Sequence, residues 1–534
     1  MKEIQKITIG NLRIVYRPGE KNDPDAAAVH KAAAFLNRKT GVTPQNLQIS
    51  KKSIDARKRS ELAFVYTVYA ELDCKPSVIA KLEKEPDIKR FTEPELNLTC
   101  GTRPMEHRPV IVGFGPAGMF AGLVLAEHGF RPIIFERGAD VDERVASVER
   151  FTREGILDTD TNIQFGAGGA GTFSDGKLTT RIGDANIAYV LRKLHELGAP
   201  ADIEYKAKPH IGTDILRDVV KETDRVITSL GGEIHYKTKV TDITDKTVTA
   251  GGSVVPYSVL ILATGHSARD TYAELLAKGY LIEPKPFSVG VRAEHLQEDI
   301  DRAMFGTLAG DAMLGHAEYQ LSYREGDRGC YTFCMCPGGT VVPSASEEFG
   351  VVTNGMSTRA RDGRNANAAV CVSVKPEDCG STPAGAIEFQ RNLERCAYRT
   401  AGSDYTAPMQ TVGDLLNGAK GTNYSRIVPT YRDGQVRPCD FHDIFPPFVT
   451  DLLKKGLTDF GRKIKGYDAP DVPLTGVETR TSAPVRILRG ETLTAPGHPG
   501  VYPCGEGAGY AGGIVSAAVD GIRVAAKIIA EYRP

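Results

Sequence analysis

The sequence lacks several features that would each mark a particular class of protein. Tryptophan is absent, and no apolar run approaches the roughly 20 residues that a transmembrane helix needs. The first residues, MKEIQKITIG, lack the apolar core of a signal peptide. None of the 10 cysteines forms a CxxC or CxxxxC pair, which argues against disulfide exchange of the thioredoxin-reductase kind. We therefore expect a cytoplasmic protein with reduced thiols and no membrane partner.

An excess of charge of one sign is also missing. Lys and Arg number 66 against 67 Asp and Glu, so the net charge of −1 makes nucleic acid an unfavoured partner for the surface as a whole. Hydrophobic residues at 41% and charged residues at 25% are typical of a globular protein. A chain of 534 residues is too long for one ordinary domain.

The first hundred residues are predicted to form a separate unit. Apolar alternation and helical patterns predict strand, helix, two strands and a second helix, an α+β domain of ferredoxin-like order over residues 1–102. A basic cluster lies at the hairpin between the two strands: Lys51, Lys52, Arg57, Lys58 and Arg59. A solvated turn is the favoured interpretation, and contact with RNA is the alternative.

A dinucleotide-binding motif follows this unit. The segment GFGPAG gives Gly113, Gly115 and Gly118 the GxGxxG spacing, between an apolar strand and a helix of small residues. Such a loop presents backbone N–H groups and a helix N-terminus to a pyrophosphate. Glu136, followed by Arg137, ends the next strand, where an acidic residue would bind the adenosine ribose hydroxyls.

Two later segments distinguish FAD from NAD. LILATG ends a buried strand at Ala263, Thr264 and Gly265, and GVYPCGEG ends another at Gly505 and Glu506. These segments resemble the FAD-binding halves of the glutathione-reductase-type superfamily. The resemblance implies that Glu506, where most relatives have Asp, accepts a hydrogen bond from a ribitol hydroxyl. Gly512, Gly513 and Ile514 would then begin a helix directed at the pyrimidine edge of the flavin.

A third glycine-rich stretch covers residues 162–181. Its glycines would let the backbone approach a flat ring, lined by Thr172, Phe173 and Ser174. Together, FGAGGAGTFSDGKL, ATGHSARDT, TFCMCPGG and CGEGAGYAGGI resemble a bacterial family of uncharacterised FAD-dependent, NAD(FAD)-utilising dehydrogenases, over essentially the whole chain. We expect FAD to contact Gly113, Gly115, Pro116, Ala117, Gly118, Glu136, Arg137, Gly168, Gly169, Gly171, Thr172, Ala263, Thr264, Gly265, Gly505, Glu506, Gly512, Gly513 and Ile514.

The expected fold is α/β and has three parts. A Rossmann-type FAD-binding domain occupies residues 103–283 and 479–534, and an α+β substrate or capping domain is inserted at residues 284–478. The small N-terminal α+β domain precedes them. Only one GxGxxG is present, so NAD(P)H, if used, would be a transient electron donor.

Residues for chemistry beyond the flavin are harder to identify. In the segment CYTFCMCPGG, a strand would place Cys330, Cys334 and Cys336 on one face. Core packing is favoured there, and a thiol near the flavin (Cys336) or a metal site are the alternatives; we expect no metal. Lys177 and Arg480 are candidates to bind an anionic group, and a surface lysine and a structural salt bridge are the alternatives. His266 is expected to be packed rather than to act as an acid or base.

Three functions are compatible with these motifs. The favoured one is an FAD-dependent oxidoreductase that transfers a hydride to or from a small-molecule substrate. The others are an RNA-acting flavoprotein that docks through its N-terminal domain, and a flavin-binding redox sensor or scaffold.

Overall fold

An antiparallel sheet with two helices forms the N-terminal unit of the computed structural model, which describes residues 3–17, 23–55, 61–93 and 95–534. Its elements follow the succession β-α-β-β-α-β, and the sheet order is β2-β3-β1-β4. The bounds are β1 (Glu3–Val15), α1 (Pro24–Thr40), β2 (Gln45–Asp55), β3 (Ala63–Cys74), α2 (Pro76–Leu82) and β4 (Ile88–Arg90). Period-two burial along β3 turns one face toward α1 and α2, as the alternating sequence predicts.

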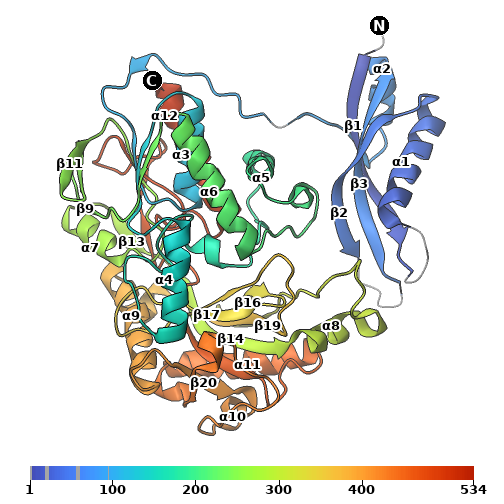
Figure 1. Cartoon of the computed structure of the whole chain (residues 1–534). Helices are drawn as coiled ribbons and strands as arrows, with labels where there is room; N and C mark the ends of the chain where they lie inside the picture. The colour runs from blue at the N-terminus through green and yellow to red at the C-terminus, as the bar shows by residue number, and fades with distance from the viewer. Residues whose placement is uncertain (1–2, 18–22, 56–60, 94) are drawn as a thin grey trace.

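The N-terminal unit contacts the rest of the chain at several places, of which two lie on its sheet and its core (Figure 1). The backbone N–H of Lys52 in β2 donates to the carbonyl of Tyr205, and Ala207 N–H donates to the carbonyl of Lys52. The Tyr16 hydroxyl donates to Asp311 at 2.7 Å, and Leu314 packs into the core of the unit. The unit is therefore attached through a strand edge and through the segment near residue 311.

A five-stranded parallel sheet forms the second part, in the order β24-β12-β6-β7-β8. Its strands are β6 (Val110–Val112), β7 (Ile133–Phe135), β8 (Glu233–His235), β12 (Leu260–Leu262) and β24 (Val501–Pro503). Strands from both ends of the chain thus lie side by side, as the motifs predict. A hairpin with a third strand lies beside this sheet: β9 (Val240–Ile243), β10 (Thr247–Ala250) and β11 (Ser253–Pro256).

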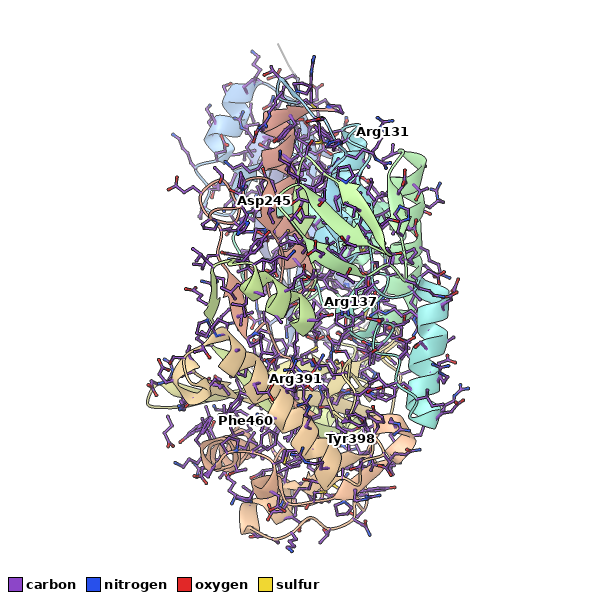
Figure 2. All side chains as sticks on the ribbon, turned by 90° about the vertical axis from the view of Figure 1, so that its left-hand side faces the viewer. Arg131, Arg137, Asp245, Arg391, Tyr398 and Phe460 are labelled. Atoms are coloured by element: carbon purple, nitrogen blue, oxygen red, sulfur yellow. The ribbon has the colours of Figure 1, made fainter. Side chains whose placement is uncertain are left out.

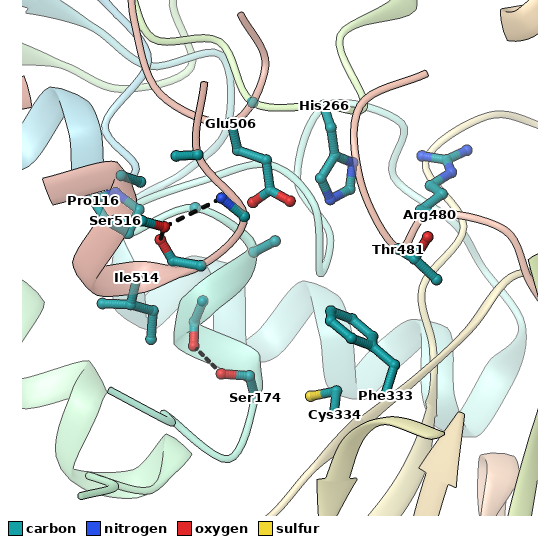
Figure 3. A pocket seen from close by; sticks show the side chains of 18 of the residues that line it. Pro116, Ser174, His266, Phe333, Cys334, Arg480, Thr481, Glu506, Ile514 and Ser516 are labelled. Carbon is teal, nitrogen blue, oxygen red and sulfur yellow. Dashed lines mark hydrogen bonds between the residues drawn. The ribbon is translucent and has the colours of Figure 1, made fainter. Parts of the chain in front are cut away.

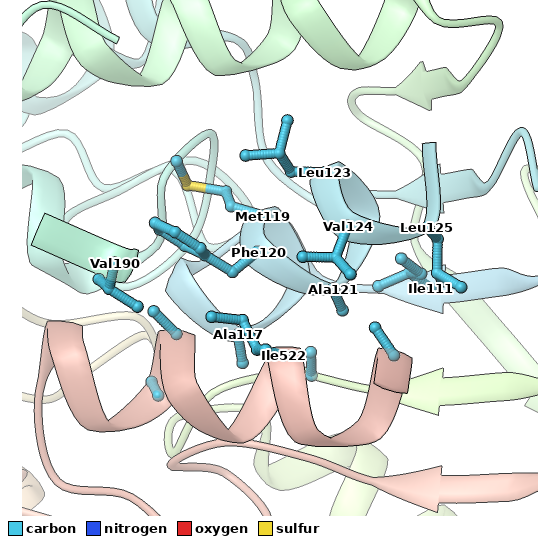
Figure 4. Close-up of a cluster of buried hydrophobic side chains, with 14 of the residues drawn as sticks. Ile111, Ala117, Met119, Phe120, Ala121, Leu123, Val124, Leu125, Val190 and Ile522 are labelled. Atoms are coloured by element: carbon cyan, nitrogen blue, oxygen red, sulfur yellow. The ribbon is translucent and has the colours of Figure 1, made fainter. Parts of the chain in front are cut away.

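Helices pack against this parallel sheet. They are α3 (Pro116–Glu127), α4 (Val141–Glu154), α5 (Asn186–Glu196), α6 (Thr213–Ser229), α7 (Arg269–Ala277) and α12 (Ile514–Glu531). Helix α3 crosses α12 closely, with Ala117 and Ala121 facing Ile522 (Figure 4). A Cβ at Gly521 would lie 2.2 Å from the carbonyl oxygen of Ala117, so this contact requires glycine. The small residues of both helices therefore set their separation.

A mixed seven-stranded sheet forms the third part, in the order β15-β16-β19-β14-β22-β20-β21. Its strands are β14 (Phe287–Leu296), β15 (Ser322–Glu325), β16 (Arg328–Cys336), β19 (Asn365–Val374), β20 (Ala407–Thr411), β21 (Val436–Pro438) and β22 (Pro473–Glu478). The helices α9 (Pro383–Thr400), α10 (Val412–Asn417) and α11 (Pro447–Lys463) lie beside it in Figure 1. The sequence predicts short strands and turns here, whereas β14 and β19 have 10 residues each and α9 has 18.

The parallel sheet and the seven-stranded sheet form two halves of one body. In the side view of Figure 2, the half marked by Arg131 and Asp245 lies above the half marked by Tyr398 and Phe460, with Arg137 between them. Within the described residues, none of the helices has the length and apolar character that a membrane span requires.

Candidate functional site

A cavity of about 1630 Å³ lies between the two halves. One wall is formed where β6, β7, β12 and β24 end, and the other comes from β15, β16 and β22. Ligands of open α/β sheets bind outside the carboxyl ends of the strands, so this position is the expected one. Figure 3 shows side chains that project into the cavity from both walls.

The GxGxxG loop forms the floor of the cavity. Gly113 has a φ of 101°, and a Cβ there would lie 2.4 Å from the carbonyl oxygen of Ala263. Gly115 precedes α3 in extended backbone, and no side chain caps that helix. The first-turn amides of α3 therefore remain free to bind an anion. Gly118 lies behind the loop, packed against the carbonyl of Gly113, and does not line the cavity.

Glu136 is buried at the end of β7 and binds three backbone amides. Its Oε2 accepts from Phe114 N–H at 2.8 Å, and its Oε1 accepts from the N–H groups of Gly138 and Gly166 at 2.9 Å each. A carboxylate offers about four acceptor sites, so one remains for a ligand hydroxyl. Glu136 thus joins the first and second glycine loops while it faces the cavity.

Arg137 reaches the cavity beside Phe165. Its guanidinium lies 4.3 Å from the centre of that ring and donates to Asp270 at 2.9 Å. The side chains of Arg137 and Phe165 both line the cavity. The edge of the cavity next to β7 is therefore a flat cation–π pair.

The second glycine-rich loop differs in detail from the prediction. Gly169, Gly171 and Ser174 line the cavity, but Thr172 and Phe173 are buried behind it. The Thr172 hydroxyl donates to the carbonyl of Ala167, and Phe173 packs against two arginines. Gly168 also lies outside the cavity, against Thr172. A short 3-10 helix at residues 170–173 places Ala170 and Gly171 at the cavity and turns Thr172 and Phe173 away from it, which a glycine count does not predict.

The C-terminal glycine loop leads into α12 at the opposite wall. Gly512 N–H donates to Ser516 Oγ at 3.2 Å, and that hydroxyl donates to the Gly513 carbonyl at 3.0 Å (Figure 3). Gly512, Gly513 and Ile514 line the cavity. Gly513 is the N-cap residue of α12, and no side chain caps the first turn of this helix. The N-terminus of an 18-residue helix therefore opens toward the cavity.

An ion pair that the sequence analysis missed holds this loop in place. Asp520 Oδ2 accepts from Gly505 N–H at 2.7 Å, and Arg489 donates to both oxygens of Asp520. The guanidinium of Arg489 also lies 3.8 Å from the centre of the Tyr510 ring. Gly505 consequently supports the loop from behind and does not line the cavity.

Glu506 projects into the cavity from the same loop (Figure 3). Burial raises the pKa of its carboxyl to about 7, and the charge of Lys285 opposes that rise. His266 faces the same region, with Nδ1 at 3.0 Å from Ser267 Oγ. Burial and the neighbouring Arg480, Arg269 and Lys285 lower the pKa of His266 to about 3, so its ring is neutral at physiological pH.

Arg480 lines the cavity but belongs to a buried ion-pair cluster. Its Nε and Nη2 donate to Glu394 at 3.1 and 3.0 Å, and Nη1 donates to the Ser346 hydroxyl. Arg269 binds the same carboxylate at 2.7 Å and also Glu347 at 2.8 Å. The structure therefore supports the salt-bridge alternative for Arg480.

Lys177 lies on the cavity wall in a mixed-charge group. Its Nζ is 3.6 Å from Asp175 and 3.4 Å from Glu318, and its side chain is 25% exposed. Arg361 binds both carboxylates. Lys177 can therefore meet a ligand without being an isolated cation.

The prediction that three cysteines share one face is wrong. The pairing of β16 with β19 shifts register between Phe333 and Cys336, so the alternation of side chains breaks there. Cys330 is buried against Gly456 and borders the cavity, and Cys334, which is less buried, also lines it. Cys336, the thiol named from the sequence, is fully buried and away from the cavity wall. In the described ranges, no group of three or more His, Cys, Asp or Glu side chains is placed to hold a metal ion.

Most of the predicted cofactor residues meet at this one cavity. Beyond those already placed, Pro116, Ala117, Ala263, Thr264 and Gly265 also line it. Of the basic cluster that is expected to form a solvated turn, with RNA contact as the alternative, Arg57, Lys58 and Arg59 lie outside the described residues. The side-chain ammonium of Lys52 lies within its own unit, 2.6 Å from Asp25 and 4.9 Å from the centre of the Phe64 ring.

Comparisons with known proteins give one family match and one long relative. Residues 286–481 match the family described as "FAD-dependent protein, C-terminal domain-like". An uncharacterised protein of Clostridium beijerinckii (strain ATCC 51743 / NCIMB 8052) is 45% identical over 496 residues, which cover 91% of this chain and 92% of that protein.

Solved structures are similar only at a distant level. Glycine oxidase from Geobacillus kaustophilus has a TM-score of 0.33 and 12% identity, covering 80% of this chain and 96% of that one. CtdE in complex with FAD has a TM-score of 0.32 and 12% identity, covering 79% and 82%. Likeness at this level says nothing of which reaction the chain performs.

Proposed function

The chain belongs to the same family as the Clostridium beijerinckii protein, and its residues 286–481 match a family model of FAD-dependent proteins; we propose on that premise that it is an oxidoreductase that holds FAD non-covalently in the cavity. One observation carries this proposal. Three glycine loops from separate parts of the chain, at residues 113–118, 166–174 and 505–514, converge on one cavity at the carboxyl ends of a parallel sheet.

The residues at the cavity fit the successive parts of FAD. The free amides of the α3 N-terminus suit the pyrophosphate, and the remaining acceptor site of Glu136 suits the adenosine ribose. Glu506 lines the cavity and is the candidate acceptor for a ribitol hydroxyl. The α12 N-terminus suits the pyrimidine edge of the ring, where it would stabilise negative charge by about 0.3–2 kcal/mol.

Bound FAD would supply the hydride chemistry, and the chain would orient it and exclude water. Strand β16 covers the cavity from the seven-stranded half, with Phe333 at 37% exposure beside Cys334. Lys177 and Glu318 bring both signs of charge to the wall. We therefore propose a small polar substrate, with NAD(P)H as a transient electron donor. The domain division at residues 102, 283 and 478 belongs to the same proposal.

The first test is the identity of the cofactor. Purified protein is expected to be yellow and to release FAD, not FMN, on denaturation. Colourless protein that reconstitutes with NAD alone contradicts the proposal. Stopped-flow bleaching of the flavin by NADH or NADPH tests the donor, and the absence of bleaching by either removes NAD(P)H from the proposal.

Substitutions at two glycines test whether FAD binds at the GxGxxG loop. Gly113→Ala is expected to abolish FAD retention, because the new Cβ would lie 2.4 Å from the Ala263 carbonyl. Gly252→Ala is the matched control: its φ of 80° is also positive, but nothing lies within 4 Å of the new Cβ. Equal FAD content in both variants would show that the loop at Gly113 does not hold the cofactor.

A further inference from the structure

Two thiols lie together where β16 ends beside the cavity. Cys334 has a φ of 45°, a strained conformation for a residue with a Cβ, at the register shift between β16 and β19. Bulges of this kind re-aim a side chain next to a functional site. Here the irregularity brings Cys334 to the cavity wall and leaves Cys336 fully buried behind it.

The two cysteines are neighbours on the strand. The Cys336 thiol donates a hydrogen bond to the Cys334 carbonyl oxygen at 3.3 Å, which holds the buried sulfur beside the residue that lines the cavity. The neighbouring Cys336 thiol and then the charge of Arg292 lower the pKa of Cys334, whereas Cys334 and burial raise the pKa of Cys336. A thiolate beside a thiol is the arrangement from which a dithiol is oxidised.

Arg292 holds the irregular end of the strand in place. Its side chain is fully buried and donates from Nη1 to the Cys334 carbonyl at 3.0 Å. Nε and Nη2 donate to Glu478 at 3.0 and 2.8 Å. The backbone of Cys334 is therefore fixed by a buried ion pair while its side chain faces the cavity.

These contacts point to a redox role that rests on the proposed function: we propose that Cys334 and Cys336 form a dithiol–disulfide couple that exchanges two electrons with FAD in the cavity. In one direction the two thiols lose two protons and two electrons as their S–S bond forms, and FAD takes up both electrons and two protons. In the reverse direction reduced flavin returns them and the S–S bond breaks. Cys334 is the thiol that faces FAD in the cavity, and Cys336 forms the disulfide bond with it.

An anaerobic dithionite titration of the full-length FAD-bound protein, first oxidised with diamide and desalted, tests the couple. Wild-type protein is expected to take up about four electrons per flavin, two for the disulfide and two for the flavin. Cys334→Ser and Cys336→Ser are each expected to take up about two. Cys396→Ser is the matched control, because this half-buried thiol on α9 bonds to the Asp443 carbonyl and does not line the cavity. It is expected to match the wild type.

Peptide mass spectrometry of the wild type gives a readout that needs no variant to fold. The oxidised protein is expected to yield a peptide in which Cys334 and Cys336 are joined and resist alkylation. Uptake of about two electrons per flavin, with both thiols open to alkylation after diamide, overturns the couple and leaves FAD binding intact. Protein that releases no FAD on denaturation overturns the proposed function instead.

Discussion

Replacing Glu394 by glutamine should destabilise the fold more than any surface change on the same helix. The Glu394 carboxylate is buried on α9 and accepts from Arg269 at 2.7 and 2.8 Å and from Arg480 at 3.0 and 3.1 Å. A neutral amide leaves these guanidinium groups buried with less compensation. Removing one partner of a buried ion pair costs about 3–5 kcal/mol. Arg269 keeps Glu347 at 2.8 Å, whereas Arg480 keeps the Ser346 hydroxyl.

The pH dependence gives this prediction a second signature. Burial alone would raise the pKa of Glu394, but the charges of Arg269 and Arg480 outweigh it and hold that pKa well below its ordinary value. A depressed pKa in the folded state stabilises the protein above the ordinary carboxyl pKa of about 4.3, and this contribution is lost as the pH falls toward the folded value. The difference in stability between the wild type and Glu394→Gln should therefore shrink below about pH 4.3.

Urea unfolding followed by far-UV circular dichroism measures the effect. Glu388→Gln is the matched control, since Glu388 lies on the same helix and pairs with Arg391 at 2.8 Å, but its side chain is 44% exposed. A surface pair of this kind contributes about 0–1 kcal/mol. Equal losses of unfolding free energy in the two variants would refute the reasoning that burial decides the cost.

Three further predictions concern the cavity and the helices beneath it. Gly521→Val should lower the unfolding free energy by about 1–3 kcal/mol through overpacking against Ala117, and unchanged urea unfolding would contradict the close α3–α12 contact. Because the pKa of Glu506 is raised to about 7, FAD affinity measured by fluorescence should rise from pH 6 to pH 8 as the carboxylate ionises. Glu506→Gln should abolish this pH dependence, and an equal pH dependence in the variant would contradict the role of Glu506. Because the pKa of His266 is lowered to about 3, its NMR signals should not titrate between pH 5 and 8. The free energy of unfolding should decrease as the pH falls from about 6.5 toward 3, since the unfolded chain binds a proton that the buried ring does not. A titration of the His266 signals near pH 6.5 would contradict the lowered pKa.

The parallel sheet could be predicted because its signals are local. GFGPAG, ATG and CGEG each end an apolar strand, and the structure places all three at one edge of the sheet. The spacing of Gly113, Gly115 and Gly118 follows from close backbone approach, which any such loop needs. The motifs therefore located the cavity, although three of the glycines support it from behind.

The cysteine and arginine sites could not be predicted in the same way. The register shift at Cys334 depends on how β16 pairs with β19, about 35 residues later, and strand alternation alone predicts the opposite face for a shifted residue. Arg480 resembles an anion-binding residue in sequence, but Glu394 reaches it from a helix 86 positions away. The Arg489–Asp520 pair carries no motif at all. Such contacts depend on tertiary packing.

The attachment of the N-terminal unit to the rest of the chain also covers part of a sheet edge that could otherwise pair with another molecule. Strand β2 has 11 residues and lies at the outer edge of its sheet, where an unpaired backbone could recruit a strand from another molecule. The bonds from Lys52 to Tyr205 and Ala207 occupy part of that edge, and the opposite edge, β4, has only three residues. Separated from the rest of the chain, the N-terminal unit would expose the whole edge of β2. The isolated unit should therefore self-associate more readily than the intact chain, in which part of this edge is covered.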